Sequence, residues 1–215
     1  LAKDTVAGFA SWVGDNFAAH EVLFLVRGML AVEIRLAELE KRPKDLEKLR
    51  EVEKLVAKAL AADKAPKAAP ALMDEFAPLF PEGFFAKAMG QFDIAIKRVS
   101  RLIELDEQDA GDTAILVQPM VYGNYGKGSA SGAFYTRDIV TGERRLQGEY
   151  YQERFNEIGA TGKDINSIDP AYLKELEKIA RKLEDKHIEI RQIRFTVENK
   201  KLWLIEQRQV VSKST

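Results

Sequence analysis

The sequence contains no cysteine and only two histidines, His20 and His187, among its 215 residues. The absence of cysteine excludes disulfide bonds, thiolate catalysis and zinc sites built from cysteine. With only two histidines, a metal cluster built from histidine or a Ser-His-Asp triad has little support. The net charge is only −1, so no bulk field attracts nucleic acid or an anionic membrane. We therefore expect no nucleic-acid partner.

Long apolar runs are also missing. The apolar segment 22–26 is soon followed by Arg27, and it is far shorter than the roughly 20 residues that cross a bilayer. We therefore expect no membrane insertion, and no signal peptide is visible. The chain begins with Leu1 rather than Met, so either a leader has been removed or the sequence is a piece of something longer. We expect an intracellular location, in an organelle if a leader has been removed.

The composition that is present is ordinary for a globular protein, with 46% hydrophobic and 31% charged residues. The first half shows the apolar spacing of amphipathic helices. Gly14-Asp15-Asn16 interrupts this pattern, and Arg42-Pro43 ends one helix and opens the next. The predicted helices cover about residues 5–13, 17–41, 44–61, a stretch from 72, and 83–105, with an acidic turn at 106–112.

The second half changes to the period of strands. Asp169-Pro170 predicts the start of a helix that runs to about Lys186. A hairpin is predicted around the turn at 198–201, because apolar and polar residues alternate before it. The predicted strands cover 114–122, 131–137, 144–151, 193–197 and 202–207. The sequence therefore predicts an α+β fold, with a helical lobe over residues 1–112 and an antiparallel sheet with a packed helix over 113–215.

A glycine-rich stretch, residues 123–132, allows two interpretations. Glycines let backbone amides approach phosphates closely, as in phosphate-binding loops. However, no Lys-Ser/Thr pair follows the stretch, and it lies between two predicted strands rather than before a helix. A hairpin loop is the favoured interpretation.

Two longer motifs resemble the nucleotide-binding domain of the pyruvate phosphate dikinase family. The first runs from Val117 to Glu143 (VQPMVYGNYGKGSASGAFYTRDIVTGE) and is followed by Gly148-Glu149-Tyr150. The second comprises residues 192–198 and 205–208, which resemble the family's DxEFTxE and LQTR strands. The resemblance implies part of an ATP-grasp domain. It covers nearly the whole chain, with its strong part from about Ala114 onward.

The resemblance also implies where a nucleotide would bind. It assigns Gln118, Met120 and Val121 to the adenine edge, although an apolar strand in a sheet core explains most of that segment equally well. It assigns Glu149 and Glu206 to the same nucleotide site. ATP and magnesium are the cofactors that the resemblance implies if the family's activity survives.

The departures from the family's pattern weigh against that activity. The family holds magnesium with a glutamate and a glutamine, and these positions are Arg194 and Glu206 here. A guanidinium has only donors and a positive charge, so it repels a cation. The family's nearby aspartate is Gln192, and its QGED loop becomes residues 155–158, which keep only the glutamate. We therefore expect no catalytic residue, no metal site and no bound cofactor.

Three interpretations of Arg194 stay open. The arginine binds phosphate directly in place of a metal, or it adapts the site to an altered nucleotide, or the site is no longer under catalytic demand. The last is favoured. We further predict a cross-strand ion pair between Arg194 and Glu206 in the space that a metal would occupy; the alternative is that both side chains point to solvent.

Two functions follow from the resemblance. The first is a truncated pseudoenzyme, a non-catalytic remnant that serves as a structural or interaction subunit and has other protein chains as partners. Here, the loss of the lobe that closes over the nucleotide is expected to expose an apolar face of the sheet. The second is the ATP-binding part of an active phosphotransferase whose N-terminal segment and histidine domain lie elsewhere.

Overall fold

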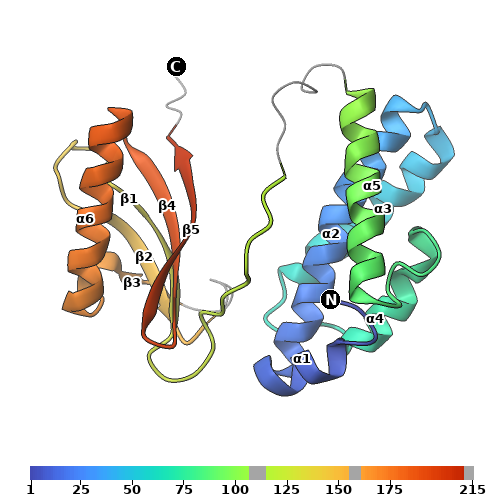
Figure 1. Ribbon diagram of the computed structural model, residues 1–215, viewed down its shortest axis with the longest axis horizontal. Helices are drawn as coiled ribbons and strands as arrows, with labels where there is room; N and C mark the ends of the chain where they lie inside the picture. The colour runs from blue at the N-terminus through green and yellow to red at the C-terminus, as the bar shows by residue number, and fades with distance from the viewer. Residues whose placement is uncertain (107–114, 155–160, 211–215) are drawn as a thin grey trace. The chain divides into compact units, whose positions relative to one another are not determined.

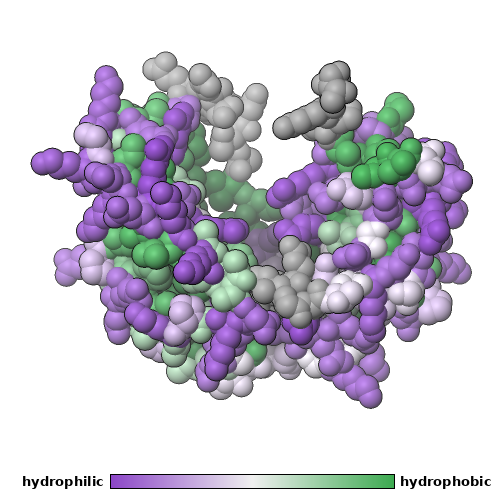
Figure 2. Space-filling model, turned by 180° about the vertical axis from the view of Figure 1, so that it is seen from behind, coloured by the Kyte–Doolittle hydropathy of each residue, from purple (hydrophilic) through white to green (hydrophobic). Residues whose placement is uncertain are grey.

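The computed structural model describes residues 1–106, 115–154 and 161–210 and has an α+β fold (Figure 1). In these residues six α-helices precede or flank one five-stranded antiparallel sheet, which confirms the predicted fold class. The chain forms two compact units, Leu1–Val117 and Gln118–Thr215. Most side chains on the face shown in Figure 2 are hydrophilic. No helix among the described residues has the length and apolar character needed to cross a membrane.

The first unit is helical, as its periodicity predicts. Gly14 separates the first two helices with a φ of 94°, a conformation that glycine adopts readily. Pro43 opens the third helix, where its missing N–H costs no hydrogen bond. The elements are α1 (Val6–Val13), α2 (Asp15–Leu39), α3 (Pro43–Leu60), α4 (Ala69–Phe76), the 3₁₀ turn η1 (Ala77–Leu79) and α5 (Ala88–Leu105).

Helix α2 supplies the centre of the helical core. Its residues Val22, Leu23, Val26 and Leu30 are fully buried, and their 3–4 spacing places them on one side of the helix. Both α3 and α4 pack against α2. Burial of apolar surface of this kind is the main force that stabilises the unit.

The second unit is a sheet with strand order β3-β2-β1-β4-β5, and every neighbouring pair is antiparallel. The helix α6 (Pro170–His187) lies across one face of the sheet (Figure 1). The side chain of Asp169 caps α6 by accepting a hydrogen bond from the Ala171 amide at 2.9 Å, as predicted. The strands are β1 (Ala130–Tyr135), β2 (Gln147–Gln152), β3 (Lys163–Asp164), β4 (Arg191–Glu198) and β5 (Lys201–Gln209); the 3₁₀ turn η2 (Ile165–Ser167) follows β3.

The core of this unit lies between α6 and the sheet. Phe134 of β1 contacts Phe195 of β4, with ring centroids 5.9 Å apart, and both are buried with Leu176 of α6. Since successive strand residues alternate in direction, the residues between these core positions face the opposite side. That side is called the outer face below.

The hairpin of β4 and β5 has the predicted register. Asn199 and Lys200 form its two-residue turn with φ values of 51° and 62°, which are typical of a type I′ turn. Arg194 lies opposite Glu206, and a register shift follows between Arg194 and Phe195. The two positions therefore face each other across neighbouring strands, as the unchanged spacing predicts.

The predicted strand at 114–122 is wrong for the part that the structure describes, since residues 115–122 form no strand. Both edges of β1 are occupied, by β2 and by β4, so no place beside β1 is left for a preceding hairpin partner. Leu116 is instead 81% exposed. The predicted features at 107–112 and 155–158 lie outside the described residues.

Candidate functional site

The outer face of the sheet carries three rows of side chains that run across four strands. Each row contains one residue from each of β2, β1, β4 and β5, because β1 pairs with both β2 and β4, and β4 pairs with both β1 and β5. Neighbouring strands are roughly 4.8 Å apart, so members of a row are close neighbours. The rows are Tyr151-Ser131-Thr196-Trp203, Glu149-Ala133-Arg194-Glu206 and Gln147-Tyr135-Gln192-Arg208.

Small side chains on β1 make this face hollow. Ser131 and Ala133 lie between the larger residues of β2 on one side and those of β4 on the other. The hollow has a volume of about 580 Å³, and Glu149, Tyr151, Arg194 and Thr196 are among the residues that line it. A volume of this order suits a small-molecule ligand. This hollow, named the β1 trough, is the candidate site.

The charged groups at the β1 trough are held unequally. Glu149 accepts a hydrogen bond from the Tyr151 hydroxyl at 2.9 Å. Arg208 donates from Nε to Glu206 at 2.5 Å. Arg194 is exposed, and within the part of the chain that the structure describes it forms no hydrogen bond or ion pair. The trough therefore contains one guanidinium whose hydrogen-bonding capacity is unused.

The predicted ion pair between Arg194 and Glu206 does not form among the described residues, although the two positions are opposite each other. The Glu206 carboxylate contacts Arg208 instead. Residues two apart in a strand point to the same face, so Arg208 competes with Arg194 for this carboxylate. Backbone register determined which residues face each other, but it did not determine which guanidinium the carboxylate binds.

A magnesium site does not fit these residues. Magnesium prefers oxygen ligands in octahedral geometry, and in the row of Glu149, Ala133, Arg194 and Glu206 the β4 residue is an arginine. The carboxylate of Glu206 is already bound by Arg208. No group of three or more His, Cys, Asp or Glu side chains that could hold a metal occurs among the described residues.

The five residues assigned to the nucleotide by resemblance lie in two places. Glu149 lines the β1 trough, and Glu206 lies on β5 opposite Arg194. Gln118, Met120 and Val121 lie on the segment before the glycine-rich stretch, where Gln118 is exposed and Met120 is 51% exposed. These three do not line the trough in the described structure.

The glycine-rich stretch is not a loop between two hairpin strands, because no strand precedes it among the described residues. Gly126 and Gly128 have φ values of 80° and 85°, which a residue with a Cβ adopts at a cost. The amide and hydroxyl of Ser129 both donate to the Gly126 carbonyl, at 3.2 and 2.8 Å. The stretch therefore closes on itself as a tight turn that leads into β1.

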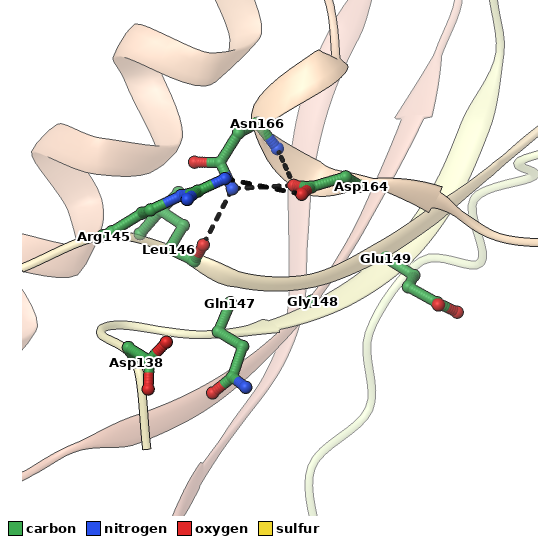
Figure 3. A pocket seen from close by; sticks show the side chains of 8 residues that line it. All are labelled: Asp138, Arg145, Leu146, Gln147, Gly148, Glu149, Asp164 and Asn166. Atoms are coloured by element: carbon green, nitrogen blue, oxygen red, sulfur yellow. Dashed lines mark hydrogen bonds and ion pairs between the residues drawn. The ribbon is translucent and has the colours of Figure 1, made fainter. Parts of the chain in front are cut away.

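A second hollow, of about 460 Å³, lies where β2 meets β3 (Figure 3). Arg145 and Asn166 point toward the Asp164 carboxylate, which accepts from the Asn166 side chain at 2.7 Å and lies 3.6 Å from Arg145. Asp138 accepts from the amides of Val140 and Thr141, both at 2.8 Å. Those hydrogen bonds hold the pKa of Asp138 below its ordinary value. Asp164 and Asp138 are thus used within the fold, unlike Arg194.

Ser131, Tyr151 and Thr196 are among the residues of the β1 trough that the sequence did not identify as site residues. The signal that would have found Thr196 was present, because Thr196 lies between the apolar residues Phe195 and Val197 and is two residues from Arg194. Ser131 and Tyr151 come from other strands, so their place beside Thr196 depends on the strand order.

Comparison with known proteins gives one consistent description. No protein-family model matches the chain. The pyruvate, phosphate dikinase of Treponema pallidum is 48% identical over 215 residues, which is 100% of this chain and 24% of that protein. The pyruvate, phosphate dikinase of Rickettsia conorii is 38% identical over 128 residues, 51% of this chain and 14% of that protein. Pyruvate, phosphate dikinase 2 of Zea mays is 36% identical over 109 residues, 45% of this chain and 12% of that protein.

Proposed function

Since this chain is a pyruvate phosphate dikinase-like domain that spans about a quarter of its Treponema pallidum relative, we propose that it is a non-catalytic piece of such a domain and serves as a structural or interaction element of a larger assembly. The observation that carries the proposal is the exposed Arg194 on the outer face, opposite Glu206, at the position where the resemblance implies a metal ligand. A cation cannot be held beside that guanidinium at low cost, because like charges repel.

Helix α5 supplies a surface through which such an element can bind another protein chain. Ile94 and Ala95 pack against the helical core. Because an α-helix turns by about 100° per residue, other apolar residues of α5 form a second stripe beside this packed side. Met89 is 76% and Phe92 46% exposed on this stripe, and its members are Met89, Phe92, Ile96, Val99 and Ile103.

The stripe follows a 3-4-3-4 spacing, which is the pattern of a helix-helix contact. It differs from the surface that the sequence led us to expect. We expected an exposed apolar face on the sheet, but the outer face carries mainly polar and charged residues. Met89 and Phe92 are exposed on α5, and because the stripe has the spacing of a helix-helix contact, the partner we propose is a helix of another chain.

A second candidate function is the ATP-binding part of an active phosphotransferase whose other segments lie elsewhere. The observation in its favour is that the match to the Treponema pallidum protein covers the whole chain at 48% identity. Under this candidate, the outer face would receive its missing groups from other parts of the assembled protein. The two candidates differ in whether this chain binds a metal-nucleotide complex.

A manganese titration distinguishes them. Mn²⁺ replaces Mg²⁺ in oxygen sites, and a protein-bound Mn²⁺–ATP complex enhances the relaxation of water protons. We expect no enhancement with the natural chain. The matched variant is Arg194→Glu with Glu206→Gln, which restores the residue types that the resemblance implies for metal binding, and it should show a gain. Stoichiometric enhancement with the natural chain would favour the second candidate.

A further inference from the structure

Strand β5 forms an edge of the sheet, and within the described residues it pairs only with β4 (Figure 1). The opposite edge is β3, whose two residues, Lys163 and Asp164, are both charged. Short, charged edges discourage the addition of another strand. β5 is longer, with nine residues, and Lys201 is the one charged residue among its first four. The sheet therefore protects one edge and leaves the other open to a further strand.

The backbone of Leu202 and Leu204 faces this open edge. The first and fourth residues of a tight turn form a hydrogen-bonded pair, and bonded and non-bonded pairs alternate along an antiparallel ladder. Glu198 and Lys201 are the pair that closes the β4–β5 hairpin. Leu202 and Leu204 therefore occupy non-bonded positions with respect to β4, and their N–H and C=O groups point toward the side on which another strand can add.

The side chains at this edge are apolar. Leu204 lies opposite the core residue Phe195, on the side of the sheet that α6 covers, and yet it is 48% exposed. Leu202 points to the same side, because it is two residues away, and it packs against the core. Trp203 lies between them and belongs to the outer face. A strand that adds at this edge can therefore bury Leu204, and the loss of exposed apolar surface favours association.

A second copy of β5 is complementary to this edge in antiparallel orientation. When the pairing is centred on Trp203, each Leu204 lies opposite Leu202 of the second copy. A parallel pairing in register would instead place Lys201 opposite Lys201, and like charges that are directly opposite destabilise a sheet. The antiparallel arrangement has the two-fold symmetry that most dimers have. We propose that two copies of the chain associate through their β5 edges, so that their two sheets join into one continuous antiparallel sheet.

Introduced cysteines test the register, because the chain contains no cysteine of its own. Across the new junction Trp203 faces its own copy at a non-bonded position, where Cα atoms are roughly 4.5 Å apart, within reach of a disulfide. Trp203→Cys should therefore give a disulfide-linked dimer of the full chain in glutathione disulfide, seen on a non-reducing gel. Leu204→Cys is the matched control, because its two copies are diagonal neighbours roughly 7–8 Å apart and should not link. A mixture of Leu202→Cys and Leu204→Cys should link, and it tests the same register without the loss of Trp203.

Sedimentation velocity of the natural chain over a range of concentrations measures the association itself. We expect a shift from monomer to dimer as the concentration rises. Leu204→Lys should weaken the dimer by about tenfold or more, because it places a charge at the junction and removes the apolar contact. Leu55→Lys is the matched control, because Leu55 is 66% exposed on α3, and it should leave the association unchanged.

The outcomes separate this inference from the proposed function, which it goes beyond. A chain that stays monomeric at every concentration would overturn the inference, and so would equal linking of Trp203→Cys and Leu204→Cys; the proposed function would stand in both cases. A dimer that is lost with Met89→Lys and kept with Leu204→Lys would assign the association to α5. That result would overturn the β5 junction while supporting α5 as the interaction surface.

Discussion

Replacing Glu184 by glutamine should destabilise the sheet unit by about 2 kcal/mol. The Glu184 carboxylate on α6 accepts two hydrogen bonds from Arg137, at 2.8 Å from Nε and 2.6 Å from the terminal nitrogen. Its side chain is only 10% exposed, and that of Arg137 is 27% exposed. The pair joins the end of β1 to the last turns of α6, so it fixes the helix against the sheet.

The magnitude follows from this geometry. A hydrogen bond to a charged group contributes about 1.5–3 kcal/mol, whereas an exposed ion pair contributes about 0–1 kcal/mol. This pair is bidentate and mostly shielded, but Arg137 retains some contact with water. Arg137→Met should cost a similar amount. The double variant should cost less than the two single costs together, because each single change leaves one charged partner without its counterpart.

Urea unfolding measures these costs. The chain has two tryptophans, with Trp12 in α1 and Trp203 in β5. A Trp12→Phe background leaves Trp203 as the reporter of the sheet unit. Glu177→Gln is the matched control on the same helix, because Glu177 lies 3.9 Å from Arg181 with both side chains largely exposed. It should cost less than about 0.5 kcal/mol.

The same pair predicts a dependence on pH. The hydrogen bonds from Arg137 are the main reason that the pKa of Glu184 lies below its ordinary value of 4.5. A carboxyl with a lowered folded-state pKa stabilises the protein above its unfolded pKa, and this contribution is lost as the pH falls through the folded value. The difference in stability between the natural protein and the Glu184→Gln variant should therefore shrink as the pH falls below the ordinary value of 4.5 and should disappear once the pH is below the folded-state pKa. Equal costs of Glu184→Gln and Glu177→Gln at about pH 7 would refute the reasoning.

Two other changes should be measurable in the same way. Burial raises the pKa of Glu21 to about 7, so the protonated side chain stabilises the folded protein fully below about pH 4.5, and this stabilisation is lost as the pH rises through 7. Glu21→Gln should remove this pH-dependent loss of stability, which amounts to up to about 3 kcal/mol. Urea unfolding followed at Trp12 between about pH 4.5 and 8 measures it, and an unchanged pH profile would contradict this. Lys200 has a φ of 62° in the β4–β5 turn, so Lys200→Gly should stabilise the sheet unit by up to about 1 kcal/mol, whereas Lys201→Gly, in the strand, should destabilise it; a loss of stability with Lys200→Gly would disprove the turn argument.

Local signals predicted much of the fold. The Asp169-Pro170 start of α6 and the β4–β5 hairpin depend on residues that are near in sequence, and the structure has both. β3 was not predicted, because Lys163–Asp164 has only two residues and is too short to show a period. The mostly apolar run at 114–122 was assigned to a strand because its residues favour burial. This segment finds no place beside β1, because the strand order puts β2 on one side of β1 and β4 on the other.

The candidate site shows the same division between local and tertiary information. The spacing in the hairpin was sufficient to place Arg194 opposite Glu206, but the choice of partner for Glu206 depended on a competing guanidinium on its own strand. That choice has a chemical consequence. An Arg194–Glu206 pair would have been a neutral, closed contact with no use for a ligand. Because Arg208 binds Glu206 instead, the Arg194 guanidinium stays open to the β1 trough. Removing the competitor with Arg208→Ala should free Glu206 to contact Arg194. The decisive measurement is a double-mutant cycle of Arg194→Ala and Glu206→Gln by urea unfolding, once in the natural chain and once in the Arg208→Ala background. A coupling of up to about 1 kcal/mol should appear only in the Arg208→Ala background. Equal coupling in the two backgrounds would mean that Arg208 does not control the partner of Glu206.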